Sequence, residues 1–209
     1  MMAGEPYDPA TISAVDAALS AILSDPVCDH QALQDLAVVR AALAEAAFQG
    51  EDADLADKRL TKAQEAAKAS ISCSPTSTRA WTILAWVEHI RNEDTPLLRT
   101  YLRKSHSSGP LEGWSLVRRM EILLELYPKL DDEETANLKQ AVNWLVTMGM
   151  SEFVGEHYIS AKPEQRLFIR DILAAAPERM QKRAADIIRN GGEDIDLPMV
   201  EALGSRPWK

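Results

Sequence analysis

The sequence has few of the features that build β-sheets, membrane spans or disulfide scaffolds. Its 209 residues include only 9 glycines and 2 cysteines. No segment alternates apolar and polar residues for long enough to predict a sheet, and no run of about 18 apolar residues predicts a membrane span. The first ten residues, MMAGEPYDPA, lack the basic region and apolar stretch of a signal peptide. What remains is a composition rich in Ala, Leu, Glu, Lys and Arg, which favours helices.

The two cysteines, Cys28 and Cys73, stand far apart and form no CxxC motif. In an all-helical chain this spacing is typical of two reduced thiols in the core. Spacing alone does not determine connectivity, so a disulfide between them stays open.

The sequence also lacks the short motifs that identify common enzymes. GxxxxGK[ST], GxGxxG, HExxH and GxSxG are all absent. The acidic run 131–134 could serve a metal or an acid–base site, but carboxylates before an apolar pattern are typical of a helix start. Glu152, Glu156 and His157 do not converge with other ligands. We therefore expect no catalytic residue, metal site or cofactor, and we keep an enzyme or small-molecule sensor with a pocket between helices as the alternative.

The charge is acidic and unevenly distributed. The net charge is −9, and residues 1–60 carry 11 acids and 3 bases, whereas residues 61–130 carry 7 acids and 10 bases. Because phosphate contacts supply most nonspecific nucleic-acid affinity, an acidic chain is a poor nucleic-acid binder. We interpret the basic middle as a solvated helix face, with a local anionic partner as the alternative.

Apolar spacing and helix stop signals predict eight to ten antiparallel helices joined by short loops at Gly50, Asn92 and Gly109. We expect a leader over 1–8, a single helical-repeat domain over 9–190 and a tail over 191–209 that docks through Leu197, Val200 and Leu203 or stays unattached. The second helix is expected to pack through a narrow stripe of small residues that includes Ala37, Ala44 and Ala47, and inward-facing positions of the third helix include Leu55. Other expected helices are listed by range: 9–23, 29–48, 75–91, 96–108, 110–127, 131–146, 165–175 and 177–189.

The region 75–119 is the centre of this pattern. Pro75 follows the cap-like Ser74 and is expected to open a helix, and Trp114 lies 33 residues after Trp81. An interval of this size is typical of helical repeats, which present binding surfaces and seldom carry chemistry. We expect one buried cluster around Trp81. Its members are Trp81, Leu84, Ala85, Tyr101 and Trp114.

Residues 63–114 resemble a tetratricopeptide repeat. Trp81, Leu84 and Ala85 match its first helix, and Tyr101 matches the aromatic of its second helix, whereas Gly109 replaces the closing proline. The resemblance implies an all-α fold of antiparallel helical hairpins stacked as a right-handed solenoid. It implies no catalytic residues.

The segments AWTILAWVE and LRTYLRKSHSSGPLEGWSLVRRMEILL are similar to tetratricopeptide-like accessory subunits of bacterial exopolysaccharide biosynthesis systems. The matching positions form a Pro, Trp, Leu-Ala pattern followed by Ser, Gly-Pro and Arg. They are Pro75, Trp81, Leu84, Ala85, Ser105, Gly109, Pro110 and Arg118. This similarity implies a scaffold role beside polysaccharide polymerisation or export. As it stands the sequence predicts a cytoplasmic location, or an envelope-associated one if an upstream anchor was removed.

The partner-binding stripe is expected on the first helix of the central unit. Arg79, Thr82, Trp86 and His89 step by three, four and three residues, and Glu112, Ser115 and Arg119 extend the stripe from the next unit. In tetratricopeptide-like arrays this stripe lines the concave groove. A protein or peptide with apolar and anionic character, or acidic polysaccharide machinery, would suit it. Packing of Trp86 against a neighbouring helix is the alternative, and self-association through the acidic N-terminal helices is a third.

Overall fold

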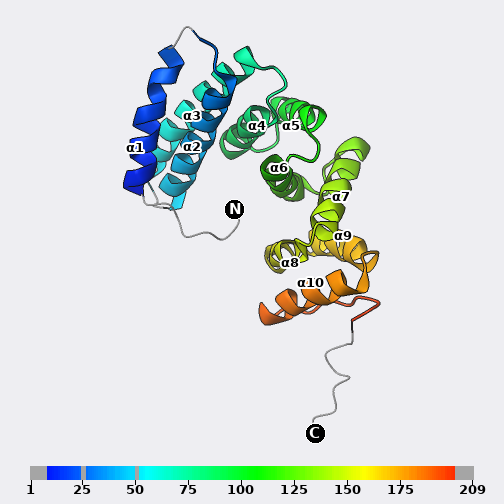
Figure 1. Ribbon diagram of the computed structural model, residues 1–209. Helices are drawn as coiled ribbons and strands as arrows, with labels where there is room; N and C mark the ends of the chain where they lie inside the picture. Colours follow the sequence, from blue (N-terminus) through cyan, green and yellow to red (C-terminus); the bar gives the residue numbers. More distant parts are fainter. Residues whose placement is uncertain (1–8, 25–26, 50–51, 201–209) are drawn as a thin grey trace. The chain divides into compact units, whose positions relative to one another are not determined.

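The computed structural model describes residues 9–24, 27–49 and 52–200. Over these ranges every regular element is a helix, so the all-α class is confirmed (Figure 1). The chain divides into two compact units, 1–118 and 119–209. The predicted leader 1–8, the loop at Gly50 and the end of the tail lie outside the described residues. The single domain predicted over 9–190 stays a prediction, because compactness does not measure cooperative folding.

Ten α-helices and one 3₁₀ turn occupy the described ranges. Unit 1 contains α1 (Pro9–Ser20), η1 (Ala21–Ser24), α2 (His30–Gln49), α3 (Ala53–Cys73), α4 (Thr78–Asn92), α5 (Pro96–Ser108) and the start of α6 (Gly113–Leu126). Unit 2 contains the rest of α6, α7 (Asp132–Thr147), α8 (Ser151–Ser160), α9 (Pro163–Ala174) and α10 (Glu178–Asn190). None of the described helices is both long and apolar enough to cross a bilayer.

Local capping determines several helix starts. The Thr95 hydroxyl accepts a hydrogen bond from the Leu98 amide at 3.0 Å, and Pro96 occupies the first helical position of α5. Asp131 and Glu134 each accept a hydrogen bond from the other's backbone amide and form a capping box at α7. The expectation that the acidic run starts a helix is therefore confirmed.

Two predicted helix starts are wrong by three residues. The Ser74 amide bonds to the Ser70 carbonyl and ends α3, whereas Ser77 immediately precedes α4. Pro75 thus lies in the turn between the helices. In the same way α6 begins at Gly113 rather than at Pro110, because the Glu112 carboxylate accepts a hydrogen bond from the Ser115 amide at 2.9 Å.

Small side chains let α2 and α3 pack closely in unit 1. Ala37 and Ala44 on α2 are fully buried, as are Ala63 and Ala67 on α3. The alanine stripe predicted for α2 is confirmed as a packing face. Leu55 was expected to face inward but is 36% exposed, because it lies in the first turn of α3.

Helix α4 is packed against α2, α3 and α5. Ala80, Ile83, Ala85 and Val87 are fully buried, although they lie on different sides of the helix. The antiparallel order that the short loops imply for consecutive helices stays a prediction. The right-handed solenoid implied by the tetratricopeptide resemblance stays a prediction.

The prediction of two reduced core thiols is wrong. Cys28 and Cys73 form a disulfide with a Cα–Cα distance of 5.7 Å, and Cys28 is exposed. Two residues after Cys28 the helix α2 begins, and Cys73 is the last residue of α3. The covalent bond therefore joins the ends of the two helices that share the alanine-rich core.

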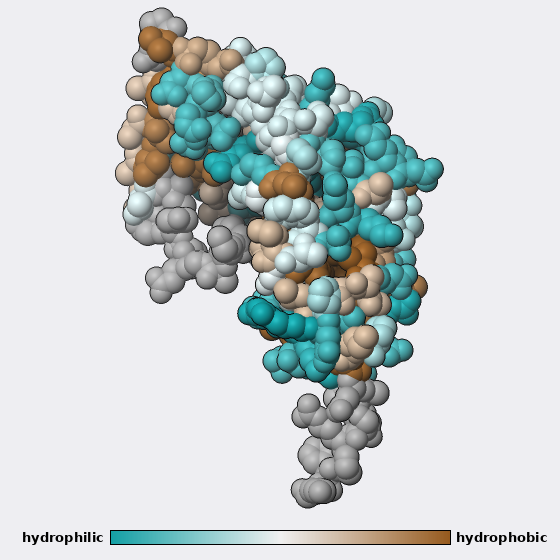
Figure 2. Space-filling model, turned by 45° about the vertical axis from the view of Figure 1, so that its right-hand side comes forward, coloured by the Kyte–Doolittle hydropathy of each residue, from teal (hydrophilic) through white to brown (hydrophobic). Residues whose placement is uncertain are grey.

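The N-terminal edge of unit 1 leaves apolar side chains in solvent. Val15 and Leu23 are each 40% exposed. Figure 2 shows apolar side chains along this edge. The self-association kept as an alternative has an apolar surface available there, and it stays a prediction.

Unit 2 holds the described part of the tail against its helices. Ile195 and Leu197 are buried, and the Tyr158 hydroxyl donates to the Asp194 carbonyl at 3.3 Å. Docking through Leu197 is confirmed, whereas Val200 is half-buried and Leu203 lies outside the described residues.

Candidate functional site

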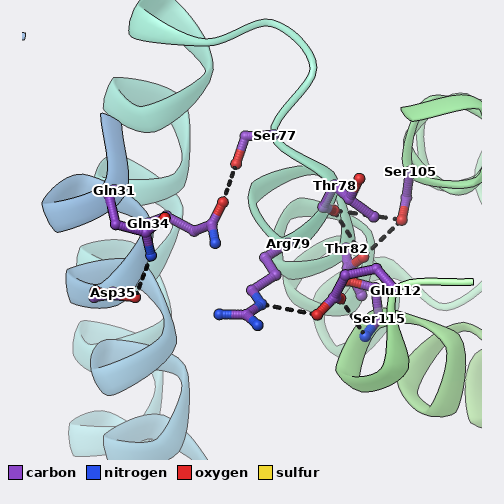
Figure 3. Close-up of polar contacts among 10 residues, drawn as sticks. All are labelled: Gln31, Gln34, Asp35, Ser77, Thr78, Arg79, Thr82, Ser105, Glu112 and Ser115. Carbon is purple, nitrogen blue, oxygen red and sulfur yellow. Dashed lines mark hydrogen bonds and ion pairs between the residues drawn. The ribbon is translucent and has the colours of Figure 1, made fainter. Parts of the chain in front are cut away.

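Arg79 is a predicted site residue that forms an ion pair within the protein and still reaches solvent. Its Nε donates to the Glu112 carboxylate at 3.0 Å, and the two side chains are 36% and 28% exposed. Glu112 also caps α6, so this ion pair links α4 to the start of α6 (Figure 3).

Thr82 is fully buried and connects two helices. Its hydroxyl donates to the Thr78 carbonyl at 2.9 Å and lies 2.6 Å from the Ser105 hydroxyl on α5. Figure 3 shows Thr78, Thr82 and Ser105 directed toward one another between α4 and α5. Because both hydroxyls are satisfied inside the protein, Thr82 holds the helix pair together and is not available to a partner.

Trp86 is only 6% exposed, so the alternative that it packs against neighbouring helices is confirmed. The guanidinium carbon of Arg118 lies 5.6 Å from the Trp86 ring centroid and 5.9 Å from that of Trp114. Arg118 also forms an ion pair with Glu45 on α2. A guanidinium held between two indole rings is a cation–π contact that stabilises packing.

The sequence prediction assigned Arg119, and not Arg118, to the surface around these tryptophans. The signal was present in the sequence, since Trp114 and Arg118 are four residues apart on one helix and face each other. Arg119 itself is 3% exposed. His89 is half-exposed near the end of α4, with Nδ1 3.3 Å from the Glu93 carbonyl oxygen.

The predicted open stripe is therefore wrong for four of its seven residues. Thr82, Trp86, Ser115 and Arg119 are buried, whereas Arg79, His89 and Glu112 reach solvent. The physical reason for the two α4 residues is the packing of α4, which three helices cover. A stripe computed from helical spacing cannot tell which side of such a helix remains uncovered.

The exposed polar groups near Arg79 come from α2. Gln31 donates to Asp35 at 3.0 Å, and the Ser77 hydroxyl donates to Gln34 at 2.9 Å. Figure 3 shows Gln34 reaching from α2 toward Ser77, and Arg79 directed into the space between α4 and α2. We call this surface the α2–α4 polar face. It consists of Gln31, Gln34, Asp35, Arg79 and Glu112.

The Glu112 carboxylate is held in its charged form. Partial burial opposes ionisation, but hydrogen bonds from Ser115 and from Arg79 outweigh it and lower the pKa of Glu112. The ion pair between Arg79 and Glu112 is therefore present throughout the neutral range.

A separate cavity lies between α1, α2 and α3. It has a volume of about 270 Å³, and its polar lining comes from all three helices. The polar lining residues are Ser13, Asp16, Arg40, Lys58, Arg59 and Lys62. The sequence predicted an inter-helix pocket only as a general alternative, and none of these residues was assigned to its lining.

Within the described ranges, no group of three or more His, Cys, Asp and Glu side chains is placed to hold a metal ion. Comparisons with protein-family models, with curated proteins and with solved structures give no match.

Proposed function

We propose that this chain is a non-catalytic helical-repeat binding module that serves as an accessory scaffold in exopolysaccharide synthesis or export. The observation that supports it best is the pair Arg79–Glu112. These residues are 33 positions apart, the interval between Trp81 and Trp114, and they join α4 to the start of α6 while remaining partly exposed. Polar side chains at this interval, one in the first turn of α4 and one just before α6, suit the binding surface of a repeat protein.

The α2–α4 polar face is the surface on which the partner docks. It carries two amides, two carboxylates and one guanidinium, so it offers many hydrogen bonds and little apolar area. Interfaces of this composition are typical of transient complexes. The partner is a polar protein segment of the polysaccharide machinery, bound chiefly by hydrogen bonds to Gln31 and Asp35 at the exposed edge.

The Cys28–Cys73 disulfide supports the envelope-associated version of this function over the cytoplasmic one. Disulfides form and persist in oxidising compartments such as the periplasm, whereas cytoplasmic thiols are kept reduced. An accessory subunit facing that compartment would keep the bond.

Deleting the gene in its native host tests the function. We expect secreted polysaccharide to fall and to be restored by the wild-type gene. Asp35→Arg should fail to restore it, because the substitution reverses a charge on the polar face. Glu65→Arg is the matched control, since Glu65 is also exposed but lies on α3.

A photo-crosslinking residue at Gln31 identifies the partner directly, with the same residue at Glu65 as the control. The expected product joins the chain to a subunit of the polysaccharide machinery from position 31 alone. Unchanged polysaccharide in the deletion strain would overturn the cellular role, and equal crosslinking from both positions would overturn the docking surface.

A further inference from the structure

The cavity between α1, α2 and α3 collects the positive charge of an otherwise acidic segment. Residues 1–60 carry 11 acids and 3 bases. Every lysine and arginine from the start of the chain to residue 62 nevertheless lines this one cavity. They are Arg40, Lys58, Arg59 and Lys62. Composition alone would scatter so few cations among so many carboxylates, so their convergence marks the cavity as a place for negative charge.

Helical geometry produces the convergence on one side. Lys58 and Lys62 are four residues apart on α3 and therefore lie on the same face, with Arg59 beside them. Arg40 approaches from α2, and Ser13 and Asp16 close the cavity from α1.

The two arginines are held in place before any ligand arrives. Arg40 is 5% exposed, and its guanidinium donates to the Asp16 carboxylate at 2.9 Å and to the Lys62 carbonyl at 3.2 Å. A third bond from Arg40 reaches the Ser20 hydroxyl at 3.1 Å. Arg59 donates to the Leu43 carbonyl at 2.8 Å. Cations fixed in this way lose little conformational freedom when they bind an anion.

The charges of the lining do not cancel. Asp16 neutralises Arg40, and the described residues offer no ion-pair partner to Lys58, Arg59 or Lys62. The cavity thus has an excess of three positive charges. Cations gathered without counter-charges repel one another, and an anion bound among them would relieve that repulsion.

We propose that this cavity binds the phosphate group of a small phosphorylated metabolite. A phosphate monoester carries a charge of about −1.5 to −2 near neutral pH and has several acceptor oxygens, which match the excess charge and the many N–H donors better than one carboxylate does. The volume of 270 Å³ is near the lower end for ligand pockets. It has room for a phosphate and a group as small as a monosaccharide, with Leu43 and Leu55 as an apolar wall.

The cavity is a specific form of the small-molecule sensor that the sequence left as an alternative. This proposal does not depend on the proposed partner-binding face. Arg59 holds the phosphate oxygens at the fixed side of the cavity, whereas Arg40 stays paired with Asp16. The exposed Lys58 and Lys62 complete the charge at its mouth.

Isothermal titration calorimetry of the full chain at constant ionic strength tests the proposal. The ligands are inorganic phosphate, glucose 6-phosphate, glucose and acetate. We expect both phosphates to bind, and glucose and acetate to give no measurable heat. Tighter binding of glucose 6-phosphate identifies an ester as the ligand, whereas equal affinity identifies phosphate alone; both results support recognition of the phosphate group.

Variants separate the cavity from general surface charge. Lys58→Gln with Lys62→Gln should weaken phosphate binding about tenfold or more, because two charge-assisted contacts are lost. Lys68→Gln with Lys129→Gln is the control, since it removes the same charge at exposed positions outside the cavity. Circular dichroism checks that both variants stay folded. The proposal is overturned if neither phosphate binds, or if the control weakens binding as much as the cavity variant does.

Discussion

Arg79 and Glu112 form an ion pair of 3.0 Å between residues that are 33 positions apart. Glu112 serves two neighbours at once, since its other carboxylate oxygen accepts the Ser115 amide at the start of α6. One side chain thereby sets where α6 begins and joins it to α4.

Glu112→Ala should lower the free energy of unfolding by about 1–2 kcal/mol, because it removes a helix cap together with an ion-pair partner. Arg79→Ala should cost less than about 1 kcal/mol, since the pair is partly exposed. Urea denaturation followed by circular dichroism measures both. Equal losses in the two variants would show that the cap contributes nothing.

The stabilisation that Glu112 contributes should depend on pH. The pKa of Glu112 is lowered in the folded state, so its contribution is present above the unfolded pKa and disappears as pH falls through the folded one. The stability difference between wild type and Glu112→Gln should therefore shrink at acidic pH. A difference that grows on acidification would contradict the assigned contacts.

The deeply buried tryptophan of unit 1 is Trp86, whereas the sequence predicted a buried cluster around Trp81. Trp86→Ala should cost about 3–5 kcal/mol, as large-to-small core changes do. Trp81 is half-buried, its ring centroid is 5.9 Å from that of Tyr101, and its indole N–H donates to the Pro75 carbonyl. Trp81→Ala should therefore cost about 1–2 kcal/mol.

The double variant Trp86→Ala with Arg119→Ala should melt at a lower temperature than the wild type, because both side chains are buried. An exposed binding stripe would instead predict an unchanged melting temperature. Differential scanning calorimetry distinguishes the two outcomes, and an unchanged melting temperature would show that Trp86 is exposed.

His157 should make unit 2 more stable at mildly acidic than at alkaline pH. Burial opposes its charged form, but the Glu121 carboxylate at 3.4 Å and the Phe153 carbonyl at 2.9 Å outweigh it and raise the pKa of His157. Glu156 acts in the same direction. Since the folded state binds the proton more tightly, the stabilisation is complete below the unfolded pKa and is lost as pH rises through the folded one.

The measurement compares urea midpoints of wild type and His157→Gln between about pH 5.5 and about pH 9, from about one unit below to about two and a half units above an ordinary histidine pKa. The urea midpoint of the wild type should exceed that of His157→Gln most at the acidic end of this pH range. His30→Gln, an exposed position at the start of α2, should follow the wild-type profile. A difference in urea midpoint between His157→Gln and wild type that does not change with pH would show that protonation of His157 is not the source of the stabilisation.

The Cys28–Cys73 disulfide should stabilise unit 1. Replacing both cysteines with serine is expected to lower the free energy of unfolding by about 2–4 kcal/mol, because the cross-link restricts the unfolded chain. A reducing agent should destabilise the wild type by a similar amount and leave the double variant unchanged. Thiol titration of the native protein that finds two free thiols would contradict the bond.

Features that arise from interactions between neighbouring residues could be predicted from the sequence. The helix start at the acidic run follows from Asp131 and Glu134, and the start of α5 follows from Thr95 and Pro96, because caps and first-turn prolines act within about four residues. The alanine stripe of α2 was readable for the same reason, since its spacing is that of a single helix.

Which helix faces are covered depends on packing between helices that are distant in the sequence. Trp86 is buried because helices from distant parts of the chain surround α4, and no local spacing encodes that coverage. Arg40 meets Lys62 because α2 packs on α3, and Cys28 meets Cys73 for the same reason. These contacts depend on packing between elements rather than on propensity within one, so the cavity and the disulfide became visible only in three dimensions.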